Sequence, residues 1–322
     1  MSALAPAQTS TDGVVIFFAY GREDIFAQTL YSILSLLHVC ERDGASGRGG
    51  PGERAGCRIA VYTDAPERFA ALPVEVVALT QAQLDEWLGG SDYIHRRKTC
   101  VILDALDRFA APVAFIDSDT WFIAHPARIF ARVGPGRAAF HLCEGFVAST
   151  GTPFDRALAR QLETVPLTLR SGEPVVFGPR TRMWNTGVIG VDPADRAALR
   201  DALELSDAIW RTADPAGAYG AKIHHPEQFA TGYALRDLAL SEAADCVYHY
   251  WPVAAKRAFG AVLPGLIAQG LADPHGATLA RIYAARYREH GLRGWLDAAK
   301  MALRRAALAL GIALPGARRS VR

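Results

Sequence analysis

Two aspartates stand one residue apart at the end of an apolar run in the middle of the chain. Residues 113–116 are apolar, Asp117-Ser118-Asp119 follows, and apolar residues resume at Trp121. Side chains alternate along an extended segment, so the two carboxylates are expected on one side, about 6–7 Å apart. At an effective dielectric constant near 20 their repulsion is about 2.5 kcal/mol. A divalent cation relieves such repulsion and carboxylate oxygens bind it well, so the motif predicts a metal site.

The same pair of acids has two other interpretations. One is a solvated turn at the end of a strand, since aspartate is common in turns. The other is an aspartyl nucleophile of the phosphatase type, but the fifth position of that motif is Thr or Val, where this chain has Trp121. The nucleophile is therefore disfavoured, and the turn and the metal site both stay open.

The elements around the motif predict where it lies. Strands are expected at 13–18, 58–62, 74–79 and 113–116, and helices at 24–39, from Thr80 or Gln81, and at 94–109. Later strands are expected at 138–148 and 188–191, followed by a helix at 193–210. This alternation predicts a mainly parallel sheet with helices on both faces. In such sheets ligands bind beyond the carboxyl ends of the strands, which is where the two acids fall.

Composition narrows the class of protein. The 322 residues carry a net charge of +2, which gives no general attraction for nucleic acid. Five widely spaced cysteines, an odd number, favour a reducing cytosol over a disulfide framework. The first residues lack the basic and apolar segments of a signal peptide, and no apolar run is long enough to span a membrane.

Four stretches of the chain resemble GT-A-fold glycosyltransferases, which use nucleotide-diphosphate sugars. They follow the order found in the glycogenin and bacterial galactosyltransferase-like group of retaining enzymes. The stretches are VAFIDSDTWF (113–122), MWNTGVIGVD (183–192), HHPEQFATGYAL (224–235) and VYHYWPVAAK (247–256). The resemblance implies an α/β fold of the GT-A (Rossmann-like) type, with a mainly parallel central sheet flanked by helices and a C-terminal helical extension.

The resemblance also implies a ligand set for the metal. Asp117, Asp119 and His249 would hold Mn²⁺ or Mg²⁺, and a neutral imidazole suits Mn²⁺ better than Mg²⁺. From the residues alone, His249 is also interpretable as a core histidine among aromatic neighbours. His224 and His225 are rival ligands.

Three residues are implied to be catalytic, namely Asn185, Glu227 and Gln228. Asn185 would bond a sugar hydroxyl, and Gly187 would let the backbone approach a ligand; the alternative is a β-turn entering a strand. Glu227, which replaces the Asp of the family, and Gln228 would face the donor sugar and stabilise an oxocarbenium-like centre. Their alternative is a helix start. Glu144 is a further candidate nucleophile.

The residues implied to contact the donor are Tyr20, Asp64, Lys98, Ser118, Gly187 and Lys256. Tyr20 and Asp64 would flank the base and ribose, and Ser118 would lie near the ribose. Lys98, with Arg97 as its alternative, would face the phosphates or the sugar. Lys256 would reach the diphosphate, although it is one residue further from the late histidine than in the family pattern.

The implied activity is transfer of a hexose from a nucleotide-diphosphate sugar, in the first instance a UDP-sugar, to an acceptor hydroxyl with retention. The acceptor is a saccharide, a lipid-linked molecule or a protein, and nucleic acid is not expected as a partner. One alternative is a sugar-nucleotide nucleotidyltransferase, whose glycine-rich basic stretch is poorly matched by residues 20–24. Another is a non-catalytic nucleotide-sugar-binding module.

The expected organisation has three parts. Residues 1–12 are expected to be a disordered leader, 13–275 a GT-A-like catalytic domain, and 276–322 a basic amphipathic helical tail. Apolar residues recur every three or four positions over 292–314. Such a helix either packs on the core or lies on an anionic membrane. The expected location is cytoplasmic, with peripheral contact at the inner membrane face in the second case.

Overall fold

The computed structural model describes residues 13–44, 58–147, 153–213 and 225–287, together with Ala299, Leu303, Ala306 and Leu310. The expected leader at 1–12 and His224 lie outside the described residues. Apart from the four single positions, so does the expected amphipathic segment at 292–314.

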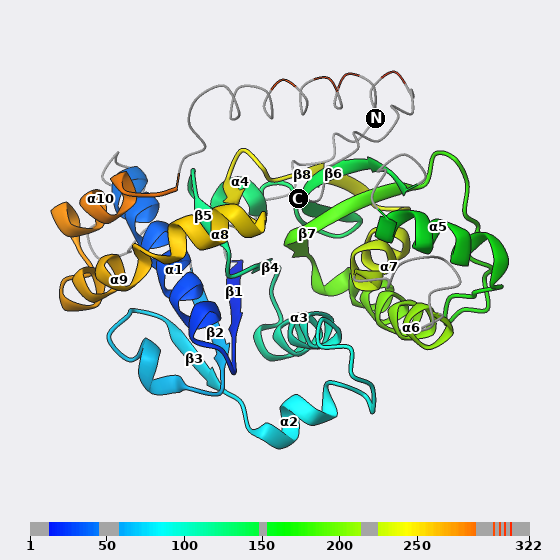
Figure 1. Ribbon diagram of the computed structural model, residues 1–322, viewed down its shortest axis with the longest axis horizontal. Coiled ribbons are helices and arrows are strands. Elements are labelled where there is room, and N and C mark those ends of the chain that lie inside the picture. Colours follow the sequence, from blue (N-terminus) through cyan, green and yellow to red (C-terminus); the bar gives the residue numbers. More distant parts are fainter. Residues whose placement is uncertain are drawn as a thin grey trace, which may run out of the picture.

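A seven-stranded sheet lies at the centre, in the order β3-β2-β1-β4-β7-β6-β8 (Figure 1). Its strands are β1 (Val14–Ala19), β2 (Arg58–Thr63), β3 (Glu75–Ala78), β4 (Val113–Ile116), β6 (Arg137–Phe146), β7 (Arg182–Val191) and β8 (Ala239–Glu242). Strand β1 pairs in parallel with β2 and β4, β2 with β3, and β6 with β8. Strand β7 is antiparallel to both its neighbours, β4 and β6. Parallel pairing therefore predominates, as the sequence predicts.

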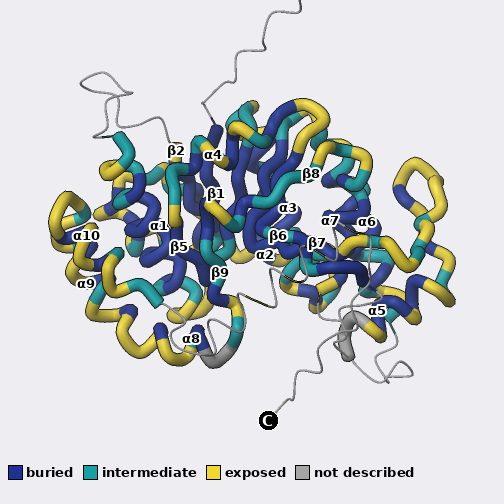
Figure 2. Tube along the Cα trace, turned by 90° about the horizontal axis from the view of Figure 1, so that it is seen from above, coloured by how far each residue is buried: buried dark blue, intermediate teal, exposed yellow. Residues whose placement is uncertain are grey.

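Helices cover both faces of this sheet. They are α1 (Glu23–Gly44), α2 (Gln81–Glu86), α3 (Arg96–Phe109), α4 (Ala127–Phe130), α5 (Pro153–Thr164), α6 (Arg196–Thr212), α7 (Pro226–Ala234), α8 (Val253–Gly260), α9 (Leu263–Ala272) and α10 (Gly276–Ala284). Phe17 of β1 packs in one apolar cluster with α1, α9 and α10, and its neighbour Ile16 packs in another with α3 and α6. The central strands β1, β4 and β7 are accordingly buried over almost their whole length, whereas the edge strands β3 and β8 are partly exposed (Figure 2). The expected fold class, an α/β fold with a mainly parallel central sheet flanked by helices, is confirmed.

Two expectations about local structure are wrong. The strand expected at 188–191 begins six residues earlier, at Arg182, so Asn185 and Gly187 lie inside β7 and not in a turn. Every residue of β7 after Arg182 is buried, including Asn185, Thr186 and Gly187, whose residue types are common in turns and therefore hide the start of the strand. Conversely, β4 ends at Ile116, so the two acids lie in a bend and strand alternation does not orient them.

A second, two-stranded sheet completes the centre of the molecule. It pairs β5 (Thr120–Phe122) with β9 (Val247–His249) in antiparallel register, with Thr120 opposite His249. This sheet places residues 247–249 beside the segment that directly follows Asp119. In the described part of the chain, no helix is long and apolar enough to cross a membrane.

Candidate metal centre

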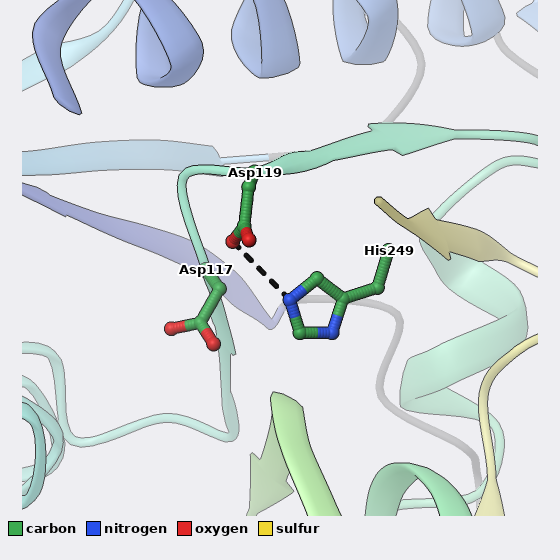
Figure 3. Close-up of side chains that lie close together, drawn as sticks. All are labelled: Asp117, Asp119 and His249. Atoms are coloured by element: carbon green, nitrogen blue, oxygen red, sulfur yellow. Dashed lines mark hydrogen bonds and ion pairs between the residues drawn. The ribbon is translucent and has the colours of Figure 1, made fainter. Parts of the chain in front are cut away.

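Asp117, Asp119 and His249 lie together beyond the carboxyl end of β4 (Figure 3). One ligand atom from each lies within 4.8 Å of the other two. The pairing of β5 with β9 brings the histidine there, and the Tyr250 amide donates to the Asp119 carbonyl at 3.0 Å. His249 Nε2 is 3.2 Å from Asp119 Oδ1. The structure therefore gathers the three side chains that the sequence predicts as ligands.

Hydroxyl groups hold the bend that carries the acids. Thr120 Oγ1 donates to the Asp117 carbonyl at 2.8 Å, so its other contact, Ser32 Oγ at 2.7 Å, must donate to it. The Phe122 amide donates to Ser35 Oγ at 2.9 Å. Both serines lie on buried positions of α1, so this helix fixes the bend and the strand after it.

Gly187 makes room for the imidazole. A Cβ at this position would lie 2.3 Å from His249 Nδ1 and 2.9 Å from Asn185 Oδ1. The Gly187 amide donates to Asn185 Oδ1 at 2.9 Å, and His249 Nδ1 lies 3.1 Å from the same oxygen. Asn185 therefore contacts the histidine in this structure, whereas the sequence predicts contact with a sugar hydroxyl.

Glu144 of β6 joins two of the predicted catalytic residues. Asn185 Nδ2 donates to Glu144 Oε1 and Gln228 Nε2 donates to Glu144 Oε2, both at 2.9 Å. The sequence names Glu144 as a candidate but offers no signal for these contacts. They depend on the pairing of β6 with β7, whose register shifts on both sides of the Leu142–Cys143 pairs.

Lys98 of α3 lies against the first acid. Its Nζ is 2.8 Å from Asp117 Oδ1. Burial lowers the pKa of Lys98, but the carboxylates of Asp117 and Glu227 outweigh that effect and raise the pKa above its ordinary value. Lys98 therefore keeps its charge beside the acid. Ser118, between the two acids, donates to Gln28 Oε1 at 3.2 Å.

Lys256 of α8 lies against the second acid. Its Nζ is 2.6 Å from Asp119 Oδ2, despite the extra residue in its spacing from His249. Burial raises the pKa of Asp119, but the imidazole and the ammonium group outweigh it and hold the pKa well below its usual range. Asp119 is thus an ionised carboxylate.

Glu227 is buried in a separate network. The Tyr93 hydroxyl donates to its carboxylate, and Tyr93 stacks on Trp210 at 4.5 Å between ring centroids. Burial raises the pKa of Glu227, but the charges of His95 and Lys98 outweigh it, so the pKa is lowered. Glu227 and Gln228, which are adjacent in α7, therefore belong to different hydrogen-bond networks, although the sequence predicts one role for both.

Tyr20 and Asp64 follow adjacent parallel strands, β1 and β2, whose last paired residues are Ala19 and Thr63. Asp64 accepts from the Gly21 amide at 3.1 Å. Arg97, the alternative to Lys98, lies over the Tyr20 ring at 4.9 Å. Tyr20 and Asp64 therefore lie at the same edge of the sheet as the two acids, just after neighbouring strands.

The donor set fits a hard or borderline divalent cation. Two carboxylates suit Mg²⁺ and Mn²⁺, and the imidazole favours Mn²⁺. The side chains of Asp119 and His249 are 7% and 6% exposed, so the protein and not solvent fixes their orientation.

No protein-family model and no curated protein match the chain. Among solved structures, the apo form of mouse xyloside xylosyltransferase 1 matches with 12% sequence identity and a TM-score of 0.40. The match covers 72% of this chain and 84% of that chain. A likeness at this level shows neither the family nor the activity of this chain.

Proposed function

We propose that the protein is a metal-dependent glycosyltransferase whose donor is a nucleotide-diphosphate sugar. The observation that supports this best is the meeting of Asp117, Asp119 and His249 beyond the carboxyl end of β4. Lys98 and Lys256 add positive charge at the same place, which suits a diphosphate. The four resembling sequence stretches support the same activity.

Cleavage of a sugar–phosphate bond leaves negative charge on the departing diphosphate. A divalent cation at this site supplies Lewis-acid stabilisation of that charge, worth several kcal/mol. Lys256 is the more exposed of the two lysines, at 39% of its side chain, and is proposed to bind the diphosphate. Lys98, at 10%, holds Asp117 in place.

The sugar is proposed to bind on the side of Glu144 and Gln228. Their carboxylate and amide are half-buried and joined to each other, which suits them to hydrogen-bond hydroxyl groups. Glu227 lies deeper, and its ionised carboxylate would stabilise positive charge at the anomeric carbon from a distance.

The finer identity is proposed on the resemblance alone. The donor would be a UDP-hexose, the metal Mn²⁺, and the outcome retention at the anomeric carbon. The acceptor would be a hydroxyl of a saccharide, a lipid-linked molecule or a protein. Contact with a membrane would depend on residues 292–314.

A donor screen tests the class of activity. Thermal unfolding is measured with UDP-, GDP- and CMP-sugars, each with and without Mn²⁺. We expect one nucleotide to raise the melting temperature, and more so with the metal, because a ligand of the folded state stabilises it. No shift with any nucleotide sugar would contradict the proposal, and turnover of a nucleoside triphosphate with a sugar phosphate would indicate a nucleotidyltransferase.

Asp119→Asn tests the metal centre. Loss of one ligand is expected to lower metal-dependent turnover by about 100-fold or more, since the metal contributes several kcal/mol. Asp245→Asn is the matched control, because that aspartate binds Arg132 away from the site and should keep turnover. Turnover of Asp119→Asn that matches the untreated wild type and persists in EDTA would refute the role of the metal.

A further inference from the structure

We propose that Glu144 is a positioning residue that sets the tautomer of His249 through Asn185, and thereby the affinity of the site for its divalent cation. The inference rests on the proposed function, because it takes His249 to be a metal ligand. It assigns Glu144 a role other than nucleophile.

The first step is the orientation of the Asn185 amide. An ionised carboxylate only accepts hydrogen bonds, so the group 2.9 Å from Glu144 Oε1 must be the Asn185 NH₂. On the other side, the Gly187 amide can only donate, so it must meet the Asn185 oxygen. A reversed amide would place two acceptors together at one end and two donors at the other. The two neighbours therefore allow a single orientation.

The second step passes this orientation to the histidine. Asn185 Oδ1 only accepts, and it lies 3.1 Å from His249 Nδ1, so that nitrogen must carry a proton. In the neutral ring the lone pair is then on Nε2, which lies 3.2 Å from Asp119 Oδ1. A proton on Nε2 in the metal-free protein, or the divalent cation that replaces it, satisfies both this lone pair and the carboxylate. The relay therefore prepares Nε2 as a ligand.

Burial makes the relay effective. Asn185 is 6% exposed, as is the side chain of His249, so little water is present to replace a lost partner. Hydrogen bonds in such surroundings are strong, and an unsatisfied group is costly. Gln228 holds the second oxygen of Glu144, so α7 fixes the carboxylate from the other side. Loss of a residue that orients a metal-binding histidine through hydrogen bonds typically lowers metal affinity 10- to 100-fold.

Two substitutions separate the relay from other roles of Glu144. Glu144→Met keeps most of the volume but removes the acceptor, so the Asn185 amide is free to reverse. Glu144→Gln keeps an acceptor for Asn185 Nδ2, and Gln228 meets the new NH₂ group by turning its own amide. We expect Glu144→Met to weaken Mn²⁺ binding by about 10- to 100-fold in calorimetry, and Glu144→Gln to stay near wild type.

The tautomer itself is measured by two-bond ¹H–¹⁵N correlation spectra of the neutral histidines, with His249 assigned from its absence in His249→Gln. The wild type and Glu144→Gln should show the proton on Nδ1, and Glu144→Met should show a mixture. A neutral His249 ring with its proton on Nε2 and none on Nδ1 in the wild type would overturn the proposal, even if Glu144→Met failed to fold. Equal Mn²⁺ affinity in Glu144→Met and wild type, or equal weakening in both variants, would also overturn it.

The spectra need neither metal nor donor. A protein that shows the Nδ1 tautomer but binds no Mn²⁺ would contradict the proposed function and leave the hydrogen-bond relay standing. A protein that turns over a nucleotide sugar but shows a neutral His249 ring with its proton on Nε2 and none on Nδ1 would contradict the relay alone.

Discussion

Gly187 and Gly190 lie on the same strand, β7, but different side chains approach them. A Cβ at Gly187 would meet the imidazole of His249, whereas a Cβ at Gly190 would lie 2.7 Å from a methyl group of Val133. The first contact involves a proposed metal ligand and the second only packing. A substitution at Gly187 therefore reports on metal binding, and the same substitution at Gly190 reports on packing stability alone.

Gly187→Ala is expected to weaken Mn²⁺ binding by about tenfold or more, because the ring must leave the position that aims Nε2 at Asp119. Gly190→Ala should cost about 1–3 kcal/mol of unfolding free energy through overpacking and leave metal affinity unchanged. Calorimetry with Mn²⁺ and urea unfolding of both variants check this. Wild-type metal affinity in Gly187→Ala would show that the ring does not need this space.

Hydroxyl groups of α1 hold the acidic bend and the strand after it. Substitution of two hydroxyl residues of this helix, one bonded to that strand and one not, tests this role. Ser35→Ala leaves the buried Phe122 amide without its acceptor, so we expect a loss of about 1–3 kcal/mol. Thr29→Val is the control, because Thr29 Oγ1 is buried with no hydrogen-bond partner among the described residues. That change should be neutral or stabilising. Urea unfolding measures both, and equal losses would contradict the assigned role of Ser35.

The connection between β8 and β9 is tied to the segment around α4 by an ion pair. Asp245 lies 2.6 Å from Arg132 and 2.7 Å from Arg128. The hydrogen bond from Arg132 lowers the pKa of Asp245 to about 2. A depressed carboxyl pKa contributes stability above the ordinary value of 3.8, and that contribution is lost as the pH falls towards 2.

Asp245→Asn should therefore cost less than about 1 kcal/mol at pH 6, since the carboxylate is 41% exposed and screened by solvent. The difference from wild type should disappear near pH 2. Urea unfolding at the two pH values checks this. A difference of the same size at pH 2 would mean that the substitution acts through packing and not through charge.

Sequence alone predicts the parallel half of the sheet and the acids at its edge, because buried parallel strands appear as short apolar runs that end in polar turns. It does not predict that Asn185 lies inside a strand, since Asn185, Thr186 and Gly187 are residue types common in turns, although β7 buries all three. Nor does it predict the contacts of Glu144, which follow from an irregular pairing of β6 with β7. Pairing register across long separations is not encoded in local periodicity.

Helix α10, late in the chain, packs against α1, which is near its beginning. Helix α10 begins at Gly276, where the sequence predicts that a separate tail starts, and it lies beside α1 (Figure 1). Its Leu279 and Ile282 are buried in the apolar cluster that also contains α1. The Tyr31 hydroxyl of α1 donates to the Ile282 carbonyl at 3.4 Å. These contacts join α10 to the apolar core on one face of the central sheet.

Leu279→Ala tests whether α10 is part of the cooperative core. The side chain is completely buried, so its truncation should cost about 2–5 kcal/mol of unfolding free energy through lost contacts and a cavity. Val262→Ala is the control, because Val262 is 50% exposed and its truncation should change stability by less than about 0.5 kcal/mol. Urea unfolding followed by tryptophan fluorescence measures both, and one transition is expected in each variant. If Leu279→Ala cost no more than the control, α10 would be a loosely attached tail that begins at 276, and the core would end with α9.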